Sequence, residues 1–322
     1  MSSPTLIIFR KEMRDALRSR LVLLLVLGLG VIAIVSVIVG AAAYHTKVLD
    51  YQHYLEALKQ AGGTPSAAPL YFALQLLRGA VEYLEVIGAI IAIVLGYAIV
   101  AKEKNRGTLR LLVSRPVSDT AVAVGKLLAL AAIWLIVVVA LGVVIVVSIR
   151  LVGGTFLSSS ELTRLAISLG FAWVYLFMWS ALAMGLAGLF RQLSSALVVG
   201  LIAWLVVVLI IPQIGDTMDP DNQVPGGLFA ALQVDKPHEK AVMAHFGTYE
   251  STRNTLESSS VSKRFERASF AFLGVKDRYN QRSLGYIATG MRTNIMWLTI
   301  ATVLASVFAI TQTRKRKLLR KA

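Results

Sequence analysis

Long blocks of apolar residues without charge alternate along the chain with shorter polar segments. A helix needs about 20 mostly apolar residues to cross the roughly 30 Å hydrocarbon core of a membrane, because every backbone amide must be satisfied within the segment. Six blocks meet this requirement, and they predict membrane-spanning helices over 21–43, 83–101, 120–149, 164–190, 196–214 and 292–313. The pattern therefore predicts an all-α polytopic membrane protein.

The first apolar block is expected to remain in the protein as a helix rather than to be cleaved as a secretory signal. The apolar core of a signal peptide is about 7–15 residues long. Residues 21–43 are longer, carry no charge, and follow a segment of mixed charge.

The composition agrees with a membrane protein. Hydrophobic residues make up 56% of the 322 residues and charged residues only 16%, whereas soluble domains carry roughly 25% charged residues. The chain contains no cysteine. This excludes disulfides, catalytic thiols, thiolate metal sites and iron–sulfur clusters.

The basic residues are unevenly distributed between the two sides of the predicted membrane. With six spans, segments 1–20, 102–119, 191–195 and 314–322 share one side. Together with Lys126, expected to snorkel to that surface, this side holds 18 of the 33 basic residues but only four of the 18 acidic ones. The positive-inside rule places it, and both termini, in the cytoplasm. The net charge of +15 therefore predicts topology and anionic lipid contacts of the basic tail, and no nucleic-acid partner.

The remaining segments, 44–82, 150–163 and 215–291, are expected to lie outside the cell, and neither of the two longer ones would hold a conventional enzyme domain. Apolar residues recur at helical spacing near the end of the longest one, at Val261, Phe265, Ala268 and Phe272. We expect short amphipathic helices there, either at the outer membrane surface or capping the bundle.

Residues 1–20 predict an amphipathic helix in the cytoplasmic interface. Leu6, Phe9, Met13 and Leu17 share one helical face, and basic residues occupy much of the rest. Such a helix is either a topology anchor only or also a contact for a cytoplasmic partner.

The loop 102–119 predicts a second short helix, bracketed by Gly107 and Pro116. Within it Leu109 and Leu112 contribute to an apolar face, which suits docking into a groove on another protein. Packing on the membrane surface is the alternative interpretation.

Two motifs resemble those of type-2 ABC transporter permeases. The loop motif consists of Glu103, Gly107-Thr108-Leu109, Leu111-Leu112, Ser114-Arg115-Pro116-Val117-Ser118 and Gly125-Lys126. The N-terminal motif consists of Lys11-Glu12, Asp15 and Leu17-Arg18-Ser19-Arg20. The six spans also fit this family. Within it, the chain is most similar to the permease of the nitrous-oxide-reductase maturation system.

This resemblance implies a permease subunit of a prokaryotic plasma membrane, present as a homodimer or as a heterodimer with a related subunit, and bound to two ATPase subunits. The coupling residues implied by the loop motif are Glu103, Gly107, Thr108, Leu109, Leu112, Arg115 and Pro116. Those implied by the N-terminal helix are Lys11, Glu12, Asp15 and Arg18. The chain lacks the G-x-x-x-x-G-K-[ST] nucleotide motif, so ATP and Mg²⁺ are expected on the partner and no cofactor on this chain.

Two acidic residues, Glu82 and Glu85, fall at the outer end of the second span. Acidic groups in a membrane are costly and often line a pathway or find a partner. They are candidates for a substrate or proton pathway. The alternative is an interfacial pair that Arg78, four residues before Glu82, partly compensates.

The other polar residues predict neither a metal site nor an enzyme. Asp216, Asp219 and Asp221 lack the spacing of a calcium loop, and Pro220 interrupts them. No Ser/His/Asp constellation or carboxylate pair can be assembled on one face.

The sequence therefore predicts a transport function powered by a partner. Export of a lipophilic or peptide-like substrate is the first hypothesis. In a second, the same assembly acts mechanically on an extracytoplasmic protein through 215–291 without moving a solute. In a third, the chain is a carrier or scaffold that works without an ATPase.

Overall fold

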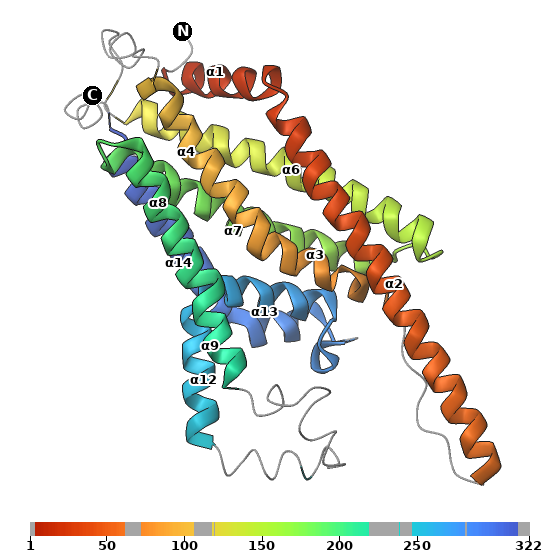
Figure 1. Cartoon of the computed structure of the whole chain (residues 1–322). Helices are drawn as coiled ribbons and strands as arrows, with labels where there is room; N and C mark the ends of the chain where they lie inside the picture. The colour runs from red at the N-terminus through yellow and green to blue at the C-terminus, as the bar shows by residue number, and fades with distance from the viewer. Residues whose placement is uncertain are drawn as a thin grey trace.

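The computed structural model describes residues 4–61, 72–105, 120–218, 247–280 and 282–314, together with Ser118 and His238. Within these residues the chain forms helices and no strand (Figure 1). Six helical stretches are long and apolar enough to cross a membrane: Leu21–Ala57, Ala73–Lys104, Ala121–Val152, Ser159–Leu189, Leu193–Thr217 and Leu284–Gln312. The prediction of an all-α polytopic fold with six spans is confirmed.

The chain begins with α1 (Pro4–Arg18), a separate helix that lies across one end of the bundle (Figure 1). Its buried residues Ile8, Glu12 and Ala16 are spaced four apart and so share one face. The helix ends at a turn in which Arg20 has a φ of 55°. This left-handed conformation cannot continue a right-handed helix, so the chain changes direction and enters the first span.

The first span belongs to a helix, α2 (Leu21–Ala61), that continues far beyond the predicted 21–43 into the expected external loop. Polar residues begin near Tyr44, but they do not by themselves end a helix, and the next glycine after Gly40 is Gly62. At 1.5 Å per residue, the 41 residues of α2 extend about 62 Å, roughly twice the hydrocarbon thickness. Its far end therefore projects beyond the other spans (Figure 1).

The second span is a continuous run of helices that differ in type. It consists of η1 (Ala73–Leu77), α3 (Arg78–Tyr83), the π-helix η2 (Leu84–Gly88) and α4 (Ala89–Asn105). A π-helical turn interrupts the regular α-helical bonding. Side chains from other spans bond to two of its carbonyl groups: the Tyr175 hydroxyl donates to Glu85 O (2.8 Å) and the Trp204 indole to Val86 O (3.1 Å).

The remaining spans differ from their predicted bounds by one to five residues at most ends, and the last span begins eight residues before the predicted 292. They are α6 (Ala121–Val152), α7 (Ser159–Leu189), the combined α8 (Leu193–Trp204), η3 (Leu205–Ile210) and α9 (Ile211–Thr217), and α14 (Leu284–Gln312). α7 begins before the predicted residue 164 because Ser158 and Glu161 form a capping box. The hydroxyl of Ser158 accepts from the Glu161 amide, and the Glu161 carboxylate accepts from the Ser158 amide.

Between the fifth and sixth spans, the described residues form α12 (Gly247–Ser259), α13 (Val261–Leu273) and the short η5 (Asp277–Tyr279). α13 packs against α7 and α14. Its side chains Phe265, Phe270 and Phe272 are buried, and the Phe265 ring stacks on Tyr175 with centroids 4.5 Å apart. Of the two predicted arrangements, α13 therefore has the one that caps the bundle.

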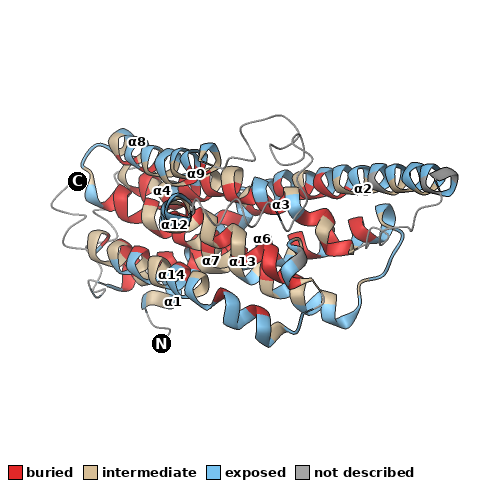
Figure 2. Cartoon of the chain, turned by 90° about the horizontal axis from the view of Figure 1, so that it is seen from below, coloured by how far each residue is buried: buried red, intermediate tan, exposed pale blue. Residues whose placement is uncertain are grey.

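The centre of the bundle is α7, which packs against α4, α6, α13 and α14. Buried residues gather along these helices (Figure 2). A hydrogen-bonded chain crosses three spans here: the Trp134 indole donates to the Ser180 hydroxyl (2.7 Å), which donates to Ala92 O (2.8 Å). These bonds satisfy polar groups that have no access to water.

Close packing of α4 on α7 depends on Gly96, where an added Cβ would lie 2.0 Å from the backbone oxygen of Ser180. Gly96→Ala is expected to destabilise the chain by about 1–3 kcal/mol through overpacking, and thermal unfolding in detergent would measure this. Gly170→Ala on α7 is the matched control, because a Cβ there meets nothing within 4 Å and alanine favours a helix. Equal unfolding midpoints for the two variants would contradict this account of the interface.

Candidate functional site

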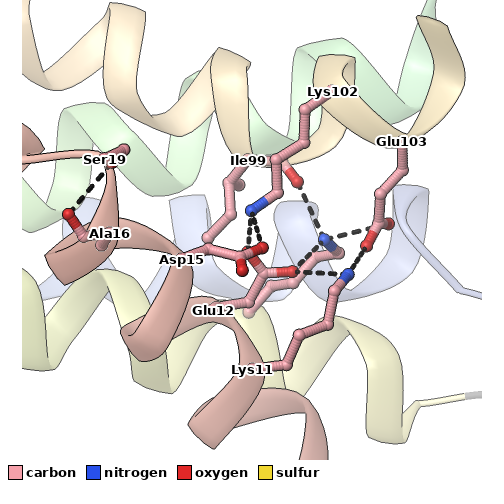
Figure 3. A network of polar contacts seen from close by, with 9 residues as sticks. Lys11, Glu12, Asp15, Ala16, Ser19, Ile99, Lys102 and Glu103 are labelled. Atoms are coloured by element: carbon pink, nitrogen blue, oxygen red, sulfur yellow. Dashed lines mark hydrogen bonds and ion pairs between the residues drawn. The ribbon is translucent and has the colours of Figure 1, made fainter. Parts of the chain in front are cut away.

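The polar residues of α1 meet the end of α4 and the beginning of α6 in a buried ionic cluster (Figure 3). At its centre the Glu12 carboxylate receives hydrogen bonds from Lys126 Nζ (2.9 Å) and from Lys102 Nζ. Lys11 Nζ lies 3.5 Å from the same carboxylate. Glu12 thus links three lysines from three helices.

A second carboxylate, Glu103, closes the cluster on the other side. It accepts a hydrogen bond from Lys11 (2.6 Å) and lies 3.0 Å from Lys126 Nζ, while Asp15 accepts a longer bond of 3.2 Å from Lys102. The charged cluster consists of Lys11, Glu12, Asp15, Lys102, Glu103 and Lys126. Its three cations and three carboxylates balance, which a buried ionic site requires.

Lys126 is the most deeply buried cation of the charged cluster. Its side chain is 1% exposed, as is that of Glu12. Besides its two carboxylates, it donates to the backbone oxygen of Ile99 (2.8 Å). The expected snorkelling of Lys126 is therefore wrong, because α1 lies over this position and supplies the partner that the lysine would otherwise seek in water.

The buried face of α1, which carries Ile8 and Ala16, explains how its carboxylates reach this depth. It differs from the predicted apolar face, of which Leu6 and Leu17 are exposed. Ile8 lies against Gly125, where an added Cβ would come within 2.9 Å of the Ile8 side chain. The missing side chain at Gly125 lets the two helices approach closely. Residue 126, next to it in sequence, is thereby brought against Glu12, one turn after Ile8.

Electrostatic attraction outweighs burial at two positions of the charged cluster. Burial alone would raise the pKa of Glu12, but attraction to Lys126 and hydrogen bonds from Lys102 and Lys126 hold this pKa below its ordinary 4.5. Burial alone would lower the pKa of Lys11, but the hydrogen bond to Glu103 and the attraction of Glu103, Glu12 and Asp15 raise it above 10.5.

By linkage, the contribution of Glu12 to stability is present above pH 4.5 and is lost as the pH falls through its folded-state pKa. The contribution of Lys11 is present below pH 10.5 and is lost as the pH rises through its own folded-state pKa.

The predicted N-terminal contact residues do not all join the charged cluster. Lys11, Glu12 and Asp15 do, and so does Glu103, which had been predicted as part of the loop. Arg18, at the end of α1, is exposed. Among the described residues it has no ion-pair partner.

Two members of the charged cluster, Lys102 and Lys126, are not among the residues that the sequence predicts to couple the chain to an ATPase. A signal for Lys126 exists in the sequence, since it is a single charge inside an otherwise apolar run. The spacing of Glu103 and Lys126 places them on different spans, so their contact could not be predicted from helical periodicity.

The other predicted coupling residues, Gly107, Thr108, Leu109, Leu112, Arg115 and Pro116, lie outside the described residues. The structure does place the two flanks of their loop. α4 ends at Asn105 and α6 begins at Ala121, so the charged cluster holds the last turn of α4 before the loop and the second turn of α6 after it. Lys104 joins the end of α4 to the end of α7, because its Nζ donates hydrogen bonds to Ala187 O (2.7 Å) and Phe190 O (2.9 Å).

The acidic pair of the second span is separated by the structure. Glu82 is exposed and forms an ion pair of 3.0 Å with Arg78, which is the interfacial pair considered from the sequence. Glu85 lies one turn deeper in the π-helix and is buried. The two carboxylates therefore do not share one environment.

Comparison with known proteins gives one match that spans most of the chain. The sequence model of the family described as "ABC-2 family transporter protein" matches residues 6–309. No curated protein matches the chain. The matched region begins within α1 and ends near the end of α14, so it includes all six spans and the entire charged cluster.

Proposed function

Because the chain belongs to the ABC-2 family of transporter proteins, we propose that a separate ATPase subunit drives its movements and that the charged cluster transmits them. Family membership makes the chain a transmembrane, non-catalytic subunit of an ABC transporter. ATP and Mg²⁺ would bind to the ATPase, and this chain would hold neither.

The observation that carries the proposal is the position of the charged cluster on both flanks of the loop 106–119. Lys102 and Glu103 lie in the last turn of α4 before this loop, and Lys126 lies in the second turn of α6 after it. All three form ion pairs with α1. Opening a buried ion pair by removing one partner costs about 3–5 kcal/mol. A push on the loop would therefore displace α1, α4 and α6 together rather than separate them.

The distribution of basic residues supports the proposed orientation, and the resemblance to type-2 ABC permeases supports the proposed stoichiometry. The excess of basic residues at the α1 end favours a cytoplasmic location in a prokaryotic plasma membrane, where an ATPase would find its nucleotide. Two permease chains and two ATPase subunits would form the complex, with the second permease either a copy of this chain or a related one. Its placement against the two least buried spans, Leu193–Thr217 and Leu284–Gln312, would cover much of their exposed apolar surface.

The proposed transport activity is export of a lipophilic or peptide-like substrate. The supporting feature is the apolar character of the spans, which offer few charged groups to a polar solute. The subgroup proposed within the family is the one similar to the permease of the nitrous-oxide-reductase maturation system.

A mechanical role on an extracytoplasmic protein is the second candidate, and the docking of α13 favours it. The Ser260 hydroxyl at the start of α13 donates to Val207 O (2.7 Å) in the π-helix of the fifth span. Arg253 and Arg267 both pair with Glu257, which joins α12 to α13. Movements of the bundle would thereby reach the external helices without passage of a solute.

Co-purification of an ATPase tests the proposal. The tagged chain is solubilised from its native membrane and purified. Mass spectrometry and an ATPase assay then examine whatever accompanies it, with the untagged chain as the background control. We expect a stoichiometric ATPase subunit carrying the nucleotide motif that this chain lacks. A monodisperse chain that retains no ATPase would contradict the proposal and favour the carrier or scaffold hypothesis.

A further inference from the structure

A narrow apolar slot separates α2 from α4 at the end of the bundle that carries α1. It has a volume of about 610 Å³. It exists because α2 packs mainly on α6 while α4 packs mainly on α7, so the two helices diverge. Its walls and floor include Leu21, Leu25, Ile91, Val94, Leu95 and Ile133.

One end of the slot is polar and carries an uncompensated positive charge. Glu12 and Asp15 line this end, but lysines of the charged cluster already neutralise both carboxylates. Arg18 and Ser19 of the α1–α2 junction also line it. Since Arg18 has no ion-pair partner among the described residues and is exposed, the mouth offers one guanidinium above an apolar interior.

The dimensions of the slot match one membrane leaflet and one hydrocarbon chain. Its lining on the second span runs from Ile90 to Lys102, which is about 18 Å at 1.5 Å per residue, close to half of the roughly 30 Å hydrocarbon core. Dividing 610 Å³ by this length gives a mean cross-section of about 34 Å², equivalent to a circle about 6.6 Å across. This shape suits an extended acyl chain better than a helix of 10–12 Å diameter.

We propose that this slot binds one glycerophospholipid of the surrounding membrane, with its phosphate beside Arg18 and one acyl chain between α2 and α4. A guanidinium is well suited to a phosphate because it presents several donors in a planar fork. The apolar walls hold the acyl chain by van der Waals packing, as the surrounding lipid does. The bound lipid would lie directly against Glu12, Asp15 and Lys102. It would therefore stabilise the packing of α1 on α4.

Native mass spectrometry of the full-length chain in detergent tests the site without any ATPase. The chain is incubated with dioleoylphosphatidylglycerol or with dioleoylglycerol, which has the same chains and no phosphate. We expect retention of the phospholipid and about fivefold less of it in Arg18→Ala, the loss typical of one arginine near an anionic surface. Val94→Trp, which fills the slot, should lower retention at least as much.

Two matched variants separate this site from general lipid attraction. Arg14→Ala removes an exposed arginine of the same helix outside the slot, and Val139→Trp adds the same indole on the lipid-facing side of α6, where Val139 is 58% exposed. Both should retain the phospholipid as the unmodified chain does. Arg18 is exposed, so its alanine variant is expected to fold, and unchanged thermal unfolding would verify this.

Three results would overturn the proposal. They are equal retention of dioleoylglycerol and phospholipid, equal losses in Arg14→Ala and Arg18→Ala, and full retention by a folded Val94→Trp chain. Because the readout is lipid bound to the chain alone, these results leave the ATPase coupling proposal untouched. Conversely, failure to find an ATPase would leave the lipid site standing.

Discussion

Replacing Glu12 with glutamine is expected to lower both the stability of the chain and its response to ATP. The amide has nearly the shape of the carboxylate but no charge, so Lys126 and Lys102 lose the group that holds them together. Because Glu12 and Lys126 are both 1% exposed, water cannot replace the missing charge, and the loss is about 3–5 kcal/mol. Thermal unfolding in detergent measures this change.

The same variant should uncouple the transporter, because α1 would no longer move with α4 and α6. We expect the stimulation of the partner ATPase by the permease, measured after reconstitution in vesicles, to fall about tenfold, within the 5–150-fold range of coupled sites. The measurement is made below the unfolding midpoint of the variant, so that loss of coupling is distinguished from loss of folded protein.

A double-mutant cycle and a matched control make this prediction specific. Lys126→Met alone should also destabilise the chain, whereas the double variant should lose less than the sum of the two, because no unpaired charge remains between them. Glu82→Gln breaks an ion pair at an exposed position, where the carboxylate is 48% exposed, and should cost under about 1 kcal/mol. Equal effects of Glu12→Gln and Glu82→Gln, or strictly additive effects in the cycle, would contradict a buried cluster that transmits force.

The six spans could be predicted because their signal is local. Each lies within a single uncharged block, and the backbone hydrogen bonds must be satisfied within one helix at that depth.

The helix ends were less predictable. The extension of α2 to Ala61 follows from a polar segment that contains no helix breaker, and the early start of α7 follows from the capping box of Ser158 and Glu161. The π-helical turns, such as Leu84–Gly88, have no comparable signature in a single sequence.

The site was predictable in parts but not as a cluster. The motifs that resemble type-2 ABC permeases led to Lys11, Glu12, Asp15 and Glu103, and family membership confirms that resemblance. What joins these residues is the packing of α1 over Gly125, a contact between helices that are more than 100 residues apart in sequence. Periodicity describes one helix at a time. It could therefore indicate which face of α1 is polar, but not that a buried lysine of the third span faces it.

Replacing Leu109 and Leu112 together with aspartate is expected to abolish stimulation of the ATPase while leaving the chain folded. Both residues lie outside the described residues, but the helices that flank their loop are described. The charged cluster fixes residues 102, 103 and 126 relative to one another, so a helix between them would deliver its displacement directly to two spans. Carboxylates on its apolar face would prevent burial in a groove of the partner, since an unpaired buried charge costs several kcal/mol. Stimulation should therefore fall to the level of the ATPase alone.

A single substitution on the opposite face of the same predicted helix separates docking from general disturbance of the loop. Residue 111 is two positions from 109, and so about 200° around a helix of 3.6 residues per turn. Leu111→Asp introduces the same side chain there and should retain most of the stimulation, whereas Leu109→Asp alone should lose much of it. Both variants should keep the unfolding midpoint of the unmodified chain, because the charged cluster is intact in each. If Leu111→Asp and Leu109→Asp reduce stimulation equally, the loop does not dock through one apolar face. If neither does, force enters the permease elsewhere, and the N-terminal helix α1, which holds Glu12 against Lys126, becomes the contact to test.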